Sequence, residues 1–290
     1  ALVTPMSDGA VAYADLERLI ERQIETEVSG IVPCGTTGES PTLSESEHLQ
    51  VIRTCVDGAK GKSLVIAGTG ANSTTEALSL TQAADDAGAD AFLLVAPYYN
   101  KPSQEGLFAH FSALAESTEK PIVLYSIPSR CGIEISTEVV CRLREKYPHV
   151  CALKEAGGRS SKVSETLISI DENFVVLSGD DGLTLPFMAC GAKGVVSVAS
   201  NLIPELVTEL VDLALVGDFE RARKIHLSYY QLFTDLFCEP NPVPVKTLMQ
   251  MKGMIESSEV RSPLIAASSE NHDLLKELGS KLSIPERIVS

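Results

Sequence analysis

An apolar stretch of the sequence ends in a lysine, at a position where a charged side chain is unexpected. Val150–Leu153 is typical of a buried β-strand, and it runs directly into Lys154. Desolvation lowers the pKa of a buried lysine and leaves a fraction of the amine neutral at pH 7. A neutral amine can attack a ketone and form a Schiff base, whose iminium makes the adjacent carbon acidic. The ordinary alternative is a lysine whose ammonium group reaches water.

A second segment places a phenol and a guanidinium close together. Tyr125 lies near the end of the apolar stretch Pro121–Ile127, and Arg130 follows it in a loop. Schiff-base chemistry needs a proton shuttle, which a tyrosine can provide, and an arginine can bind a substrate carboxylate through two hydrogen bonds. The alternatives are a core tyrosine bonded to a backbone carbonyl and a surface arginine.

The pentapeptide Gly35–Glu39, which reads Gly-Thr-Thr-Gly-Glu, offers an anion-binding loop. Its backbone N–H groups and the hydroxyls of Thr36 and Thr37 suit a carboxylate as well as a phosphate. An ordinary glycine-rich turn is the alternative.

Other kinds of catalytic site lack their sequence signatures. The histidines are isolated, without a His-Glu-x-x-His pattern, and Gly-x-Ser-x-Gly is absent. Gly68–Thr74 lacks the third glycine of a dinucleotide-binding loop, and Gly61–Ser63 lacks the leading glycine of a P-loop. We therefore expect no metal site and no serine hydrolase.

Short apolar stretches alternate with helix-length amphipathic segments, at intervals of roughly 25–30 residues, as in βαβ units. The expected strands are Ala1–Thr4, Gly30–Cys34, Leu64–Gly68, Ala91–Ala96, Pro121–Ile127, Val150–Lys154, Phe174–Ser178 and Gly194–Val198. The helices expected between them are Tyr13–Val28, Ser44–Ala59, Ser73–Ala87, Gln104–Ser117, Thr137–Tyr147, Ser160–Ile170 and Asp181–Cys190. The strands mostly lack alternation, as strands buried on both faces do. This order predicts an α/β fold, a (β/α)8 TIM barrel, with a doubly wound open sheet as the alternative.

Only helices are expected after Val198, and they form a C-terminal helical extension. They are Pro204–Val216, Phe219–Phe237, Val243–Met254 and Asn271–Gly279. The sequence therefore predicts a barrel domain over residues 1–200 and a helical domain over residues 201–290. Because Ala1–Thr4 resembles the end of a strand, we expect a truncated first strand with residues missing upstream.

Composition restricts the partners and the compartment. The formal net charge is −15 and basic runs are absent, so we expect neither nucleic acid nor an anionic membrane as a partner. The seven cysteines are scattered and lack Cys-x-x-Cys spacing, which favours a reducing cytosol over a disulfide framework. An apolar stretch long enough to span a membrane is absent.

In a barrel of this class the chemistry lies at the carboxyl ends of the strands. The residues that follow or end the predicted strands are Thr36, Thr37, Tyr98, Tyr99, Tyr125, Arg130, Lys154, Gly179 and Val196. Their convergence at one face favours a functional interpretation of Lys154.

Nine stretches together resemble the 4-hydroxy-tetrahydrodipicolinate synthase (dihydrodipicolinate synthase) family of pyruvate-dependent Schiff-base lyases. They are LVTPM, GTTGES, AGTGAN, PYYNKPSQEGL, YSIPSRCG, LKEAGG, LSGDD, GVVSV and EPNPVPVK. The resemblance covers essentially the whole chain. It implies condensation of pyruvate with L-aspartate 4-semialdehyde, the committed step of diaminopimelate and lysine biosynthesis, in the cytoplasm, or in the plastid stroma of a plant or alga. It implies no cofactor, and a monovalent cation stays open.

The resemblance also implies roles for four catalytic residues. Lys154 forms the Schiff base with pyruvate, and Tyr125 acts as acid and base on the imine and enamine. Thr36 links Tyr125 to Tyr99, which in the family comes from a neighbouring subunit. The chain is therefore expected to form a homo-oligomer, a dimer or a tetramer.

Four further residues are expected to bind substrate by the same resemblance. Thr37 holds the pyruvate carboxylate and Arg130 the carboxylate of the semialdehyde, while the backbone near Gly179 and Val196 lines the pocket. Ser126, Cys131 and Gly157 depart from the family pattern, which commonly has Asn, Thr and Thr there. Cys131 directly follows Arg130, so the change from Thr to Cys is expected to affect the position of the Arg130 guanidinium.

An allosteric site for L-lysine is a further expectation. Family members inhibited by lysine bind it through residues that match Ser40, His48, Asn72, Glu76 and Tyr98. The alternative is that Ser40, Asn72 and Glu76 only cap helices.

Two rival functions are compatible with a barrel that carries a strand-end lysine. One is another Schiff-base aldolase, such as N-acetylneuraminate lyase or a 2-keto-3-deoxy-sugar-acid aldolase. The pair Thr36-Thr37 and Arg130 argue against it, because the acid-sugar lyases typically have Ser-Thr in the loop and lack the Pro-Ser-Arg segment. The other is a non-catalytic small-molecule sensor, for which loss of Lys154 or Tyr125 would be expected.

Overall fold

A computed structural model describes residues 1–281 of the chain. The chain forms two compact units, one of residues 1–65 with the segment from residue 197 onward, and one of residues 66–196. The predicted division into residues 1–200 and 201–290 stays a prediction. The last nine positions of the predicted helical domain, 282–290, lie outside the described residues.

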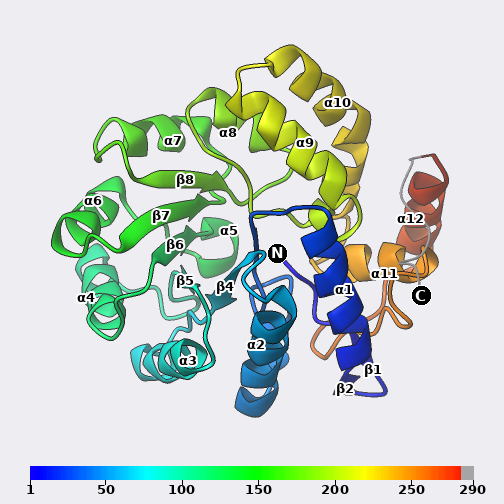
Figure 1. Ribbon diagram of the computed structural model, residues 1–290, viewed down its shortest axis with the longest axis horizontal. Coiled ribbons are helices and arrows are strands. Elements are labelled where there is room, and N and C mark those ends of the chain that lie inside the picture. The colour runs from blue at the N-terminus through cyan, green and yellow to red at the C-terminus, as the bar shows by residue number, and fades with distance from the viewer. Residues whose placement is uncertain (282–290) are drawn as a thin grey trace. The chain divides into compact units, whose positions relative to one another are not determined.

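Parallel strands in chain order form the centre of the unit of residues 66–196 (Figure 1). The last three residues of β4 (Leu64–Gly68) pair with β5, and the sheet continues through β6, β7 and β8. These strands are β5 Ala91–Val95, β6 Ile122–Ser126, β7 Val150–Glu155 and β8 Val175–Ser178. Parallel neighbours require a crossover connection, and a helix supplies it after each strand.

The crossover helices form a layer along one side of this sheet in Figure 1. They are α3 Thr74–Asp86, α4 Gln104–Ala115, α6 Thr137–Lys146, α7 Ser160–Leu167 and α8 Thr184–Ala189, while the short α5 Pro128–Cys131 follows β6 and lies outside this layer. Serine N-caps begin three of them, since Ser73, Ser103 and Ser136 each accept a hydrogen bond from a backbone N–H of the first turn. The short α5 was not expected from the sequence.

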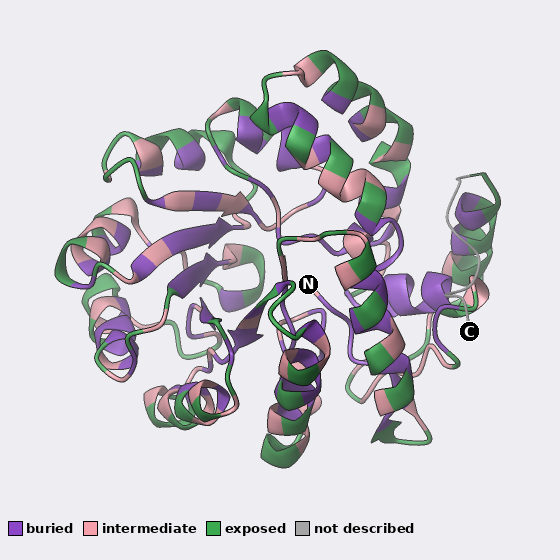
Figure 2. Cartoon of the chain, in the orientation of Figure 1, coloured by how far each residue is buried: buried purple, intermediate pink, exposed green. Residues whose placement is uncertain are grey.

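Burial of the strands matches their composition. Figure 2 shows β6 and β7 almost entirely buried, and β5 is buried except at Val95. The expectation of strands covered on both faces is confirmed for these three. In β8, buried and half-buried residues alternate, so one of its faces is less covered.

The other unit is mainly helical. Its helices are α1 Tyr13–Glu25, α2 Glu45–Ala59, α9 Pro204–Leu215, α10 Phe219–Asp235, α11 Val243–Met251 and α12 Ser269–Lys281, with 3-10 turns η1 Ser40–Thr42 and η2 Ala199–Asn201. They pack in pairs, α1 with α2, α9 with α10, and α11 with α12. Every helix predicted for this unit is present within a few residues of its expected ends. Ser44 and Glu47 form a capping box at the start of α2.

Strand structure near the N-terminus differs from the expectation. Ala1–Thr4 forms no strand, although the Leu2 N–H donates to the Val32 carbonyl at 3.0 Å. A hairpin of β1 (Met6–Ser7) and β2 (Ala10–Val11) follows instead. Asp8 and Gly9 have φ of 52° and 79° at its tip, and Asp-Gly is a strong sequence signal for such a turn.

Two other predicted strands are shorter than expected. β3 covers only Gly30–Ile31 because Pro33 has no N–H to donate and Cys34 has a φ of 55°. Of Gly194–Val198, only Val195 bridges to Ser178, since the chain turns into η2 at Val198.

Within residues 1–281, no helix combines the length and the apolar character needed to cross a bilayer. All seven cysteines are free thiols.

Candidate active site

Lys154 is buried near the carboxyl end of β7, with 6% of its surface exposed. Burial lowers the pKa of its ammonium group to about 7, the Asp181 carboxylate opposes this shift, and the Arg130 guanidinium adds to it. A sizeable fraction of the amine is therefore neutral near pH 7, as a nucleophilic lysine requires.

Tyr125 is the register partner of Lys154 on the neighbouring strand β6. The Lys154 Nζ lies 4.0 Å from the centre of the Tyr125 ring, and the tyrosine is 4% exposed. The ring face favours a cation above it, so Tyr125 stabilises the protonated amine while burial destabilises it. The two groups expected to share the proton chemistry are thus in direct contact.

Gly179 leaves room for the lysine side chain. A Cβ atom at this position would lie 3.2 Å from Lys154 Cε and 2.7 Å from Ala156 Cβ. The Gly179 N–H donates to the Glu155 carbonyl at 2.8 Å, and the Val196 N–H donates to the carbonyl of Ser178, also at 2.8 Å. The expected pocket-lining backbone is therefore held by ladder-type hydrogen bonds, and Gly179 borders the lysine.

A second glycine, Gly157, contacts the buried carboxyl group of Glu155, the residue that follows Lys154. The Gly157 N–H donates to Glu155 Oε1 at 2.6 Å, and a Cβ atom on Gly157 would lie 2.5 Å from that oxygen. Burial raises the pKa of the Glu155 carboxyl to about 7. The glycine that departs from the family pattern thus lets the loop after β7 close over this carboxyl.

The α5 turn carries Arg130 on an anchored backbone. Cys131 is 2% exposed, and its thiol donates to the Ala96 carbonyl at 3.1 Å. Burial raises the pKa of this thiol to about 11, which makes it unreactive. Arg130 itself is exposed, and its positive charge reaches Lys154, as the lowered lysine pKa records.

The loop after β5 presents two tyrosines in different ways. Tyr99 is 89% exposed and has a φ of 73°, a backbone region that non-glycine residues rarely adopt. Tyr98 is half-buried, and its carbonyl accepts a hydrogen bond from Asn72 Nδ2 at 3.2 Å. Burial raises the pKa of the Tyr98 phenol, and the Glu76 carboxylate raises it further. Asn72, Glu76 and Tyr98 therefore gather in one place, and Ser73 rather than Asn72 caps α3.

The Gly35–Glu39 loop belongs to the other unit and is tightly packed. Thr37 is 3% exposed, and its hydroxyl accepts a hydrogen bond from Asn241 Nδ2 at 2.9 Å. A Cβ atom on Gly38 would lie 2.9 Å from the backbone nitrogen of Cys34, so only glycine fits there. Thr36, by contrast, is half-buried.

A buried ion pair holds the end of this loop. Lys246 Nζ lies 2.6 Å from Glu39 Oε1, and their side chains are 0% and 1% exposed. Burial lowers the pKa of Lys246, and the Glu39 carboxylate opposes the shift. The lysine also donates to the Thr4 carbonyl at 3.0 Å, and the Arg261 N–H donates to Glu39 Oε2 at 3.0 Å. The loop is thus fixed by segments distant in sequence.

The remaining two residues of the expected lysine site also lie in this unit. Ser40 is half-buried, and its N–H donates to the Gly35 carbonyl at 3.3 Å. His48 is 4% exposed in α2, and its carbonyl accepts a weak hydrogen bond from the Cys34 thiol at 3.6 Å. Ser40 is the first residue of η1, whose N-cap is Glu39, so it does not cap that turn.

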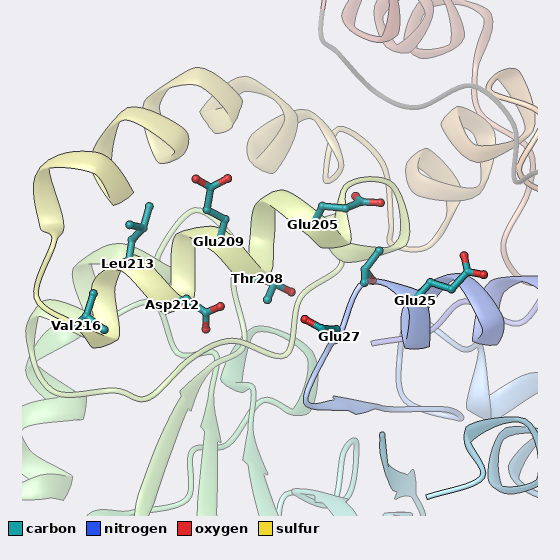
Figure 3. A pocket seen from close by; sticks show the side chains of 9 residues that line it. Glu25, Glu27, Glu205, Thr208, Glu209, Asp212, Leu213 and Val216 are labelled. Atoms are coloured by element: carbon teal, nitrogen blue, oxygen red, sulfur yellow. The ribbon is translucent and has the colours of Figure 1, made fainter. Parts of the chain in front are cut away.

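A separate hollow of about 500 Å³ contains none of the expected site residues. Figure 3 shows its acidic lining, which consists of Glu25, Glu27, Glu205, Glu209 and Asp212. Because this lining repels carboxylates, the hollow does not suit the expected substrates. Within residues 1–281, His, Cys, Asp and Glu side chains form no group of three or more able to hold a metal ion.

Sequence reasoning missed three residues that shape the site. Asp181, Asn241 and Lys246 act on Lys154, Thr37 and Glu39 respectively. Lys246 follows the apolar stretch Val243–Val245, just as Lys154 follows an apolar stretch, so its burial could have been predicted from the sequence. The Asn241 contact has no local signal.

The order of strands and helices, including the helices after residue 203, is that of a (β/α)8 TIM barrel with a C-terminal helical extension. Within this class, the chain is a barrel protein with a buried lysine at the end of a strand, Lys154. The chain belongs to the dihydrodipicolinate synthetase family, whose model it matches over residues 1–281. The predicted family and fold class are confirmed.

Individual relatives agree with this assignment. The chain is 50% identical to the 4-hydroxy-tetrahydrodipicolinate synthase of Sulfurihydrogenibium sp. over 98% of its own length and 97% of the relative's. The crystal structure of dihydrodipicolinate synthase from Aquifex aeolicus superposes with a TM-score of 0.97 at 48% identity, covering 99% of this chain and 98% of that one. The enzyme from Cyanidioschyzon merolae with lysine bound has a TM-score of 0.94 at 37% identity, with 97% and 96% covered.

Proposed function

We propose that the chain catalyses the condensation of pyruvate with L-aspartate 4-semialdehyde to 4-hydroxy-tetrahydrodipicolinate, the committed step of diaminopimelate and lysine biosynthesis. The observation that carries this proposal is the buried Lys154, whose pKa is lowered to about 7. The relative of 50% identity is named for this synthase, which favours it over the other Schiff-base aldolases.

The chemistry begins with the neutral amine of Lys154. Its lone pair attacks the C2 carbonyl of pyruvate, and the resulting carbinolamine loses water to give an iminium ion. The iminium withdraws electrons from the methyl group, which loses a proton and becomes the nucleophilic carbon of an enamine. This carbon attacks the aldehyde of the semialdehyde. The amino group of the semialdehyde then attacks C2 and displaces Lys154, which closes the ring and restores the free amine.

We assign the proton transfers to Tyr125, whose ring lies beside the amine and whose phenol can both donate and accept a proton. We assign Thr36 to the link between Tyr125 and the Tyr99 of a neighbouring subunit. The exposure of Tyr99, at 89%, leaves its ring available to a second copy of the chain. The proposal therefore includes a homo-oligomer, either a dimer or a tetramer.

Two anion-binding groups orient the substrates in the proposal. Thr37 and its loop bind the pyruvate carboxylate through the hydroxyl and the backbone N–H groups. Arg130 binds the carboxylate of the semialdehyde, which its exposed guanidinium can reach from solvent. Gly179 and Val196 line the pocket with backbone, and Gly179 is already adjacent to Lys154.

Feedback inhibition by L-lysine is part of the proposal, through Ser40, His48, Asn72, Glu76 and Tyr98. The Cyanidioschyzon merolae relative binds lysine in its crystal structure. The Glu76 carboxylate acts on Tyr98 electrostatically and can pair with an ammonium group. We place the enzyme in the cytoplasm, or in the plastid stroma of a plant or alga, in keeping with its free thiols.

Borohydride trapping tests this function directly. The protein is incubated with pyruvate and reduced, and the modified peptide is located by mass spectrometry. A pyruvyl adduct on Lys154 is the expected result, followed by turnover with aspartate semialdehyde and no cleavage of N-acetylneuraminate. An unmodified Lys154 in folded protein would overturn the mechanism and favour the sensor.

A further inference from the structure

We infer that Asn241 is a positioning residue that directs the hydroxyl proton of Thr37 toward the substrate carboxylate. The inference rests on the proposed function, since it assigns the recipient of that proton to the carboxylate of pyruvate. It adds a residue from the segment before α11 to the anion-binding loop.

The hydrogen bond between the two side chains fixes the direction of the hydroxyl. Asn241 Nδ2 donates to Thr37 Oγ1 at 2.9 Å, and the residues are 6% and 3% exposed. A hydroxyl has one hydrogen to donate and can also accept. Because the oxygen of Thr37 already accepts, its hydrogen is left for another acceptor. Over residues 1–281, no protein group accepts it.

The orientation of the Asn241 amide is what gives Thr37 this role. With the amide reversed, Oδ1 would face Thr37, take the hydroxyl proton and leave none for an anion. In the structure Oδ1 points elsewhere, is buried, and has no hydrogen-bond partner in the described part of the chain. Among residues 1–281, the Asn241 side chain therefore makes one hydrogen bond, the bond to Thr37.

The backbone of the loop is held by other groups. The Thr4 hydroxyl donates to the Gly38 carbonyl at 2.7 Å, and Lys246 and Arg261 hold the Glu39 carboxylate. Loss of the Asn241 amide therefore leaves the loop in place and changes mainly the Thr37 hydroxyl. Because other groups hold the loop backbone, a substitution of Asn241 tests its effect on the Thr37 hydroxyl.

The test uses Asn241→Ala, Asn241→Asp, Thr37→Val and the double variant Asn241→Ala with Thr37→Val. The readout is the pyruvate concentration that gives half-maximal borohydride-trapped adduct on Lys154. We expect Asn241→Ala to raise it about three- to tenfold, as loss of one hydrogen bond implies. Asn241→Asp should raise it more, increasingly as the pH rises, because an ionised carboxylate accepts the Thr37 proton and repels pyruvate. Since Asp matches Asn in size, this variant carries the test should Asn241→Ala not fold.

The double variant distinguishes positioning from a structural effect. If Asn241 acts through the hydroxyl, then adding Asn241→Ala to Thr37→Val leaves the half-saturating concentration unchanged. A matched control is Asn271→Ala, which removes an amide that donates to Glu239 at 2.7 Å and should change nothing. Fully additive effects, or an unchanged value in both Asn241 variants, would overturn the inference. A wild-type protein without any adduct on Lys154 would instead overturn the proposed function, and the inference with it.

Discussion

Tyr125 and Lys154 face each other as register partners on adjacent strands, with the lysine amine 4.0 Å from the centre of the tyrosine ring. The contact opposes the effect of burial, since an aromatic face stabilises a cation. Burial nevertheless dominates, because the pKa of Lys154 falls to about 7. A lysine amine that is partly neutral near pH 7 and the ring of a tyrosine thus lie in direct contact.

The first prediction concerns stability, because burial of this amine is unfavourable to folding. Unfolded chains bind a proton at Lys154 up to about pH 10.4, whereas the folded protein releases it near pH 7. Between these values the unfolded state binds more protons, so stability rises with pH. We expect Lys154→Met to raise the free energy of unfolding at pH 7 by an amount on the order of 4 kcal/mol. Urea unfolding from pH 7 to 10 should show this gain shrinking, and a constant difference would contradict the shifted pKa.

The second prediction concerns two charges that act on Lys154 in opposite directions. Arg130→Met removes a charge that lowers the pKa of the lysine, so the rise of adduct formation with pH should move to higher pH. Asp181→Asn removes a charge that raises it, so the rise should move to lower pH. The measurement is the pH profile of borohydride trapping with pyruvate alone. Arg142→Met, which breaks a surface pair with Glu105, is the control and should leave the profile in place.

The third prediction concerns the space beside the lysine. Gly179→Ala places a methyl group 2.7 Å from Ala156 Cβ and 3.2 Å from Lys154 Cε. Overpacking of this kind destabilises a core by about 1–3 kcal/mol, and we expect adduct formation to slow at least about tenfold, since a small displacement of a reacting group is costly. Adding Ala156→Gly removes the closer clash and should restore part of both losses. No recovery in the double variant would show that the contact with Ala156 is not the cause.

The fourth prediction concerns the buried pair of Glu39 and Lys246. Lys246→Met leaves a buried carboxylate without its partner and should cost about 3–5 kcal/mol of unfolding free energy. Combining it with Glu39→Gln removes the unpaired charge, so urea unfolding should show the double variant more stable than Lys246→Met alone. Lys224→Ala, which breaks an exposed pair with Glu220, should leave the unfolding midpoint unchanged. Equal losses in the single and double variants would exclude an unpaired charge as the cause.

The fifth prediction concerns the proposed lysine site. Millimolar L-lysine should lower the rate of condensation, and Glu76→Gln should raise the half-inhibitory concentration about tenfold, because it removes the partner of the ligand's ammonium group. The comparison of rates with and without lysine, in each variant, cancels any change in basal activity. Gln82→Ala, which lies further along α3, is the control. Rates unaffected by lysine in the wild-type protein would end the proposal of feedback inhibition.

Local features of the fold could be predicted from the sequence because local chemistry determines them. The serine at position 44 predicts the start of α2, and the unalternated apolar stretch before Lys154 predicts a doubly covered strand. The hairpin at Asp8-Gly9 is equally local, although the predicted strands do not include it. The strand predicted at Gly194–Val198 was wrong because a 3-10 turn at its end left only one bridging residue.

Contacts between distant segments could not be predicted in this way. Lys154 was identified because its own neighbours in sequence make it unusual. Asn241 was not, because its partner Thr37 lies 204 positions away and no spacing rule connects them. The same applies to the carboxylate of Glu39 and its lysine, 207 positions apart.

These long separations have a consequence for the order in which the protein is made. The ribosome releases the Gly35–Glu39 loop long before Asn241, Lys246 and Arg261 exist, since the last of these lies 222 positions beyond Glu39. The loop therefore lacks these three contacts until the C-terminal segment has been synthesised. A chain that ends before residue 241 lacks Asn241, Lys246 and Arg261, and therefore all three of these contacts with the loop.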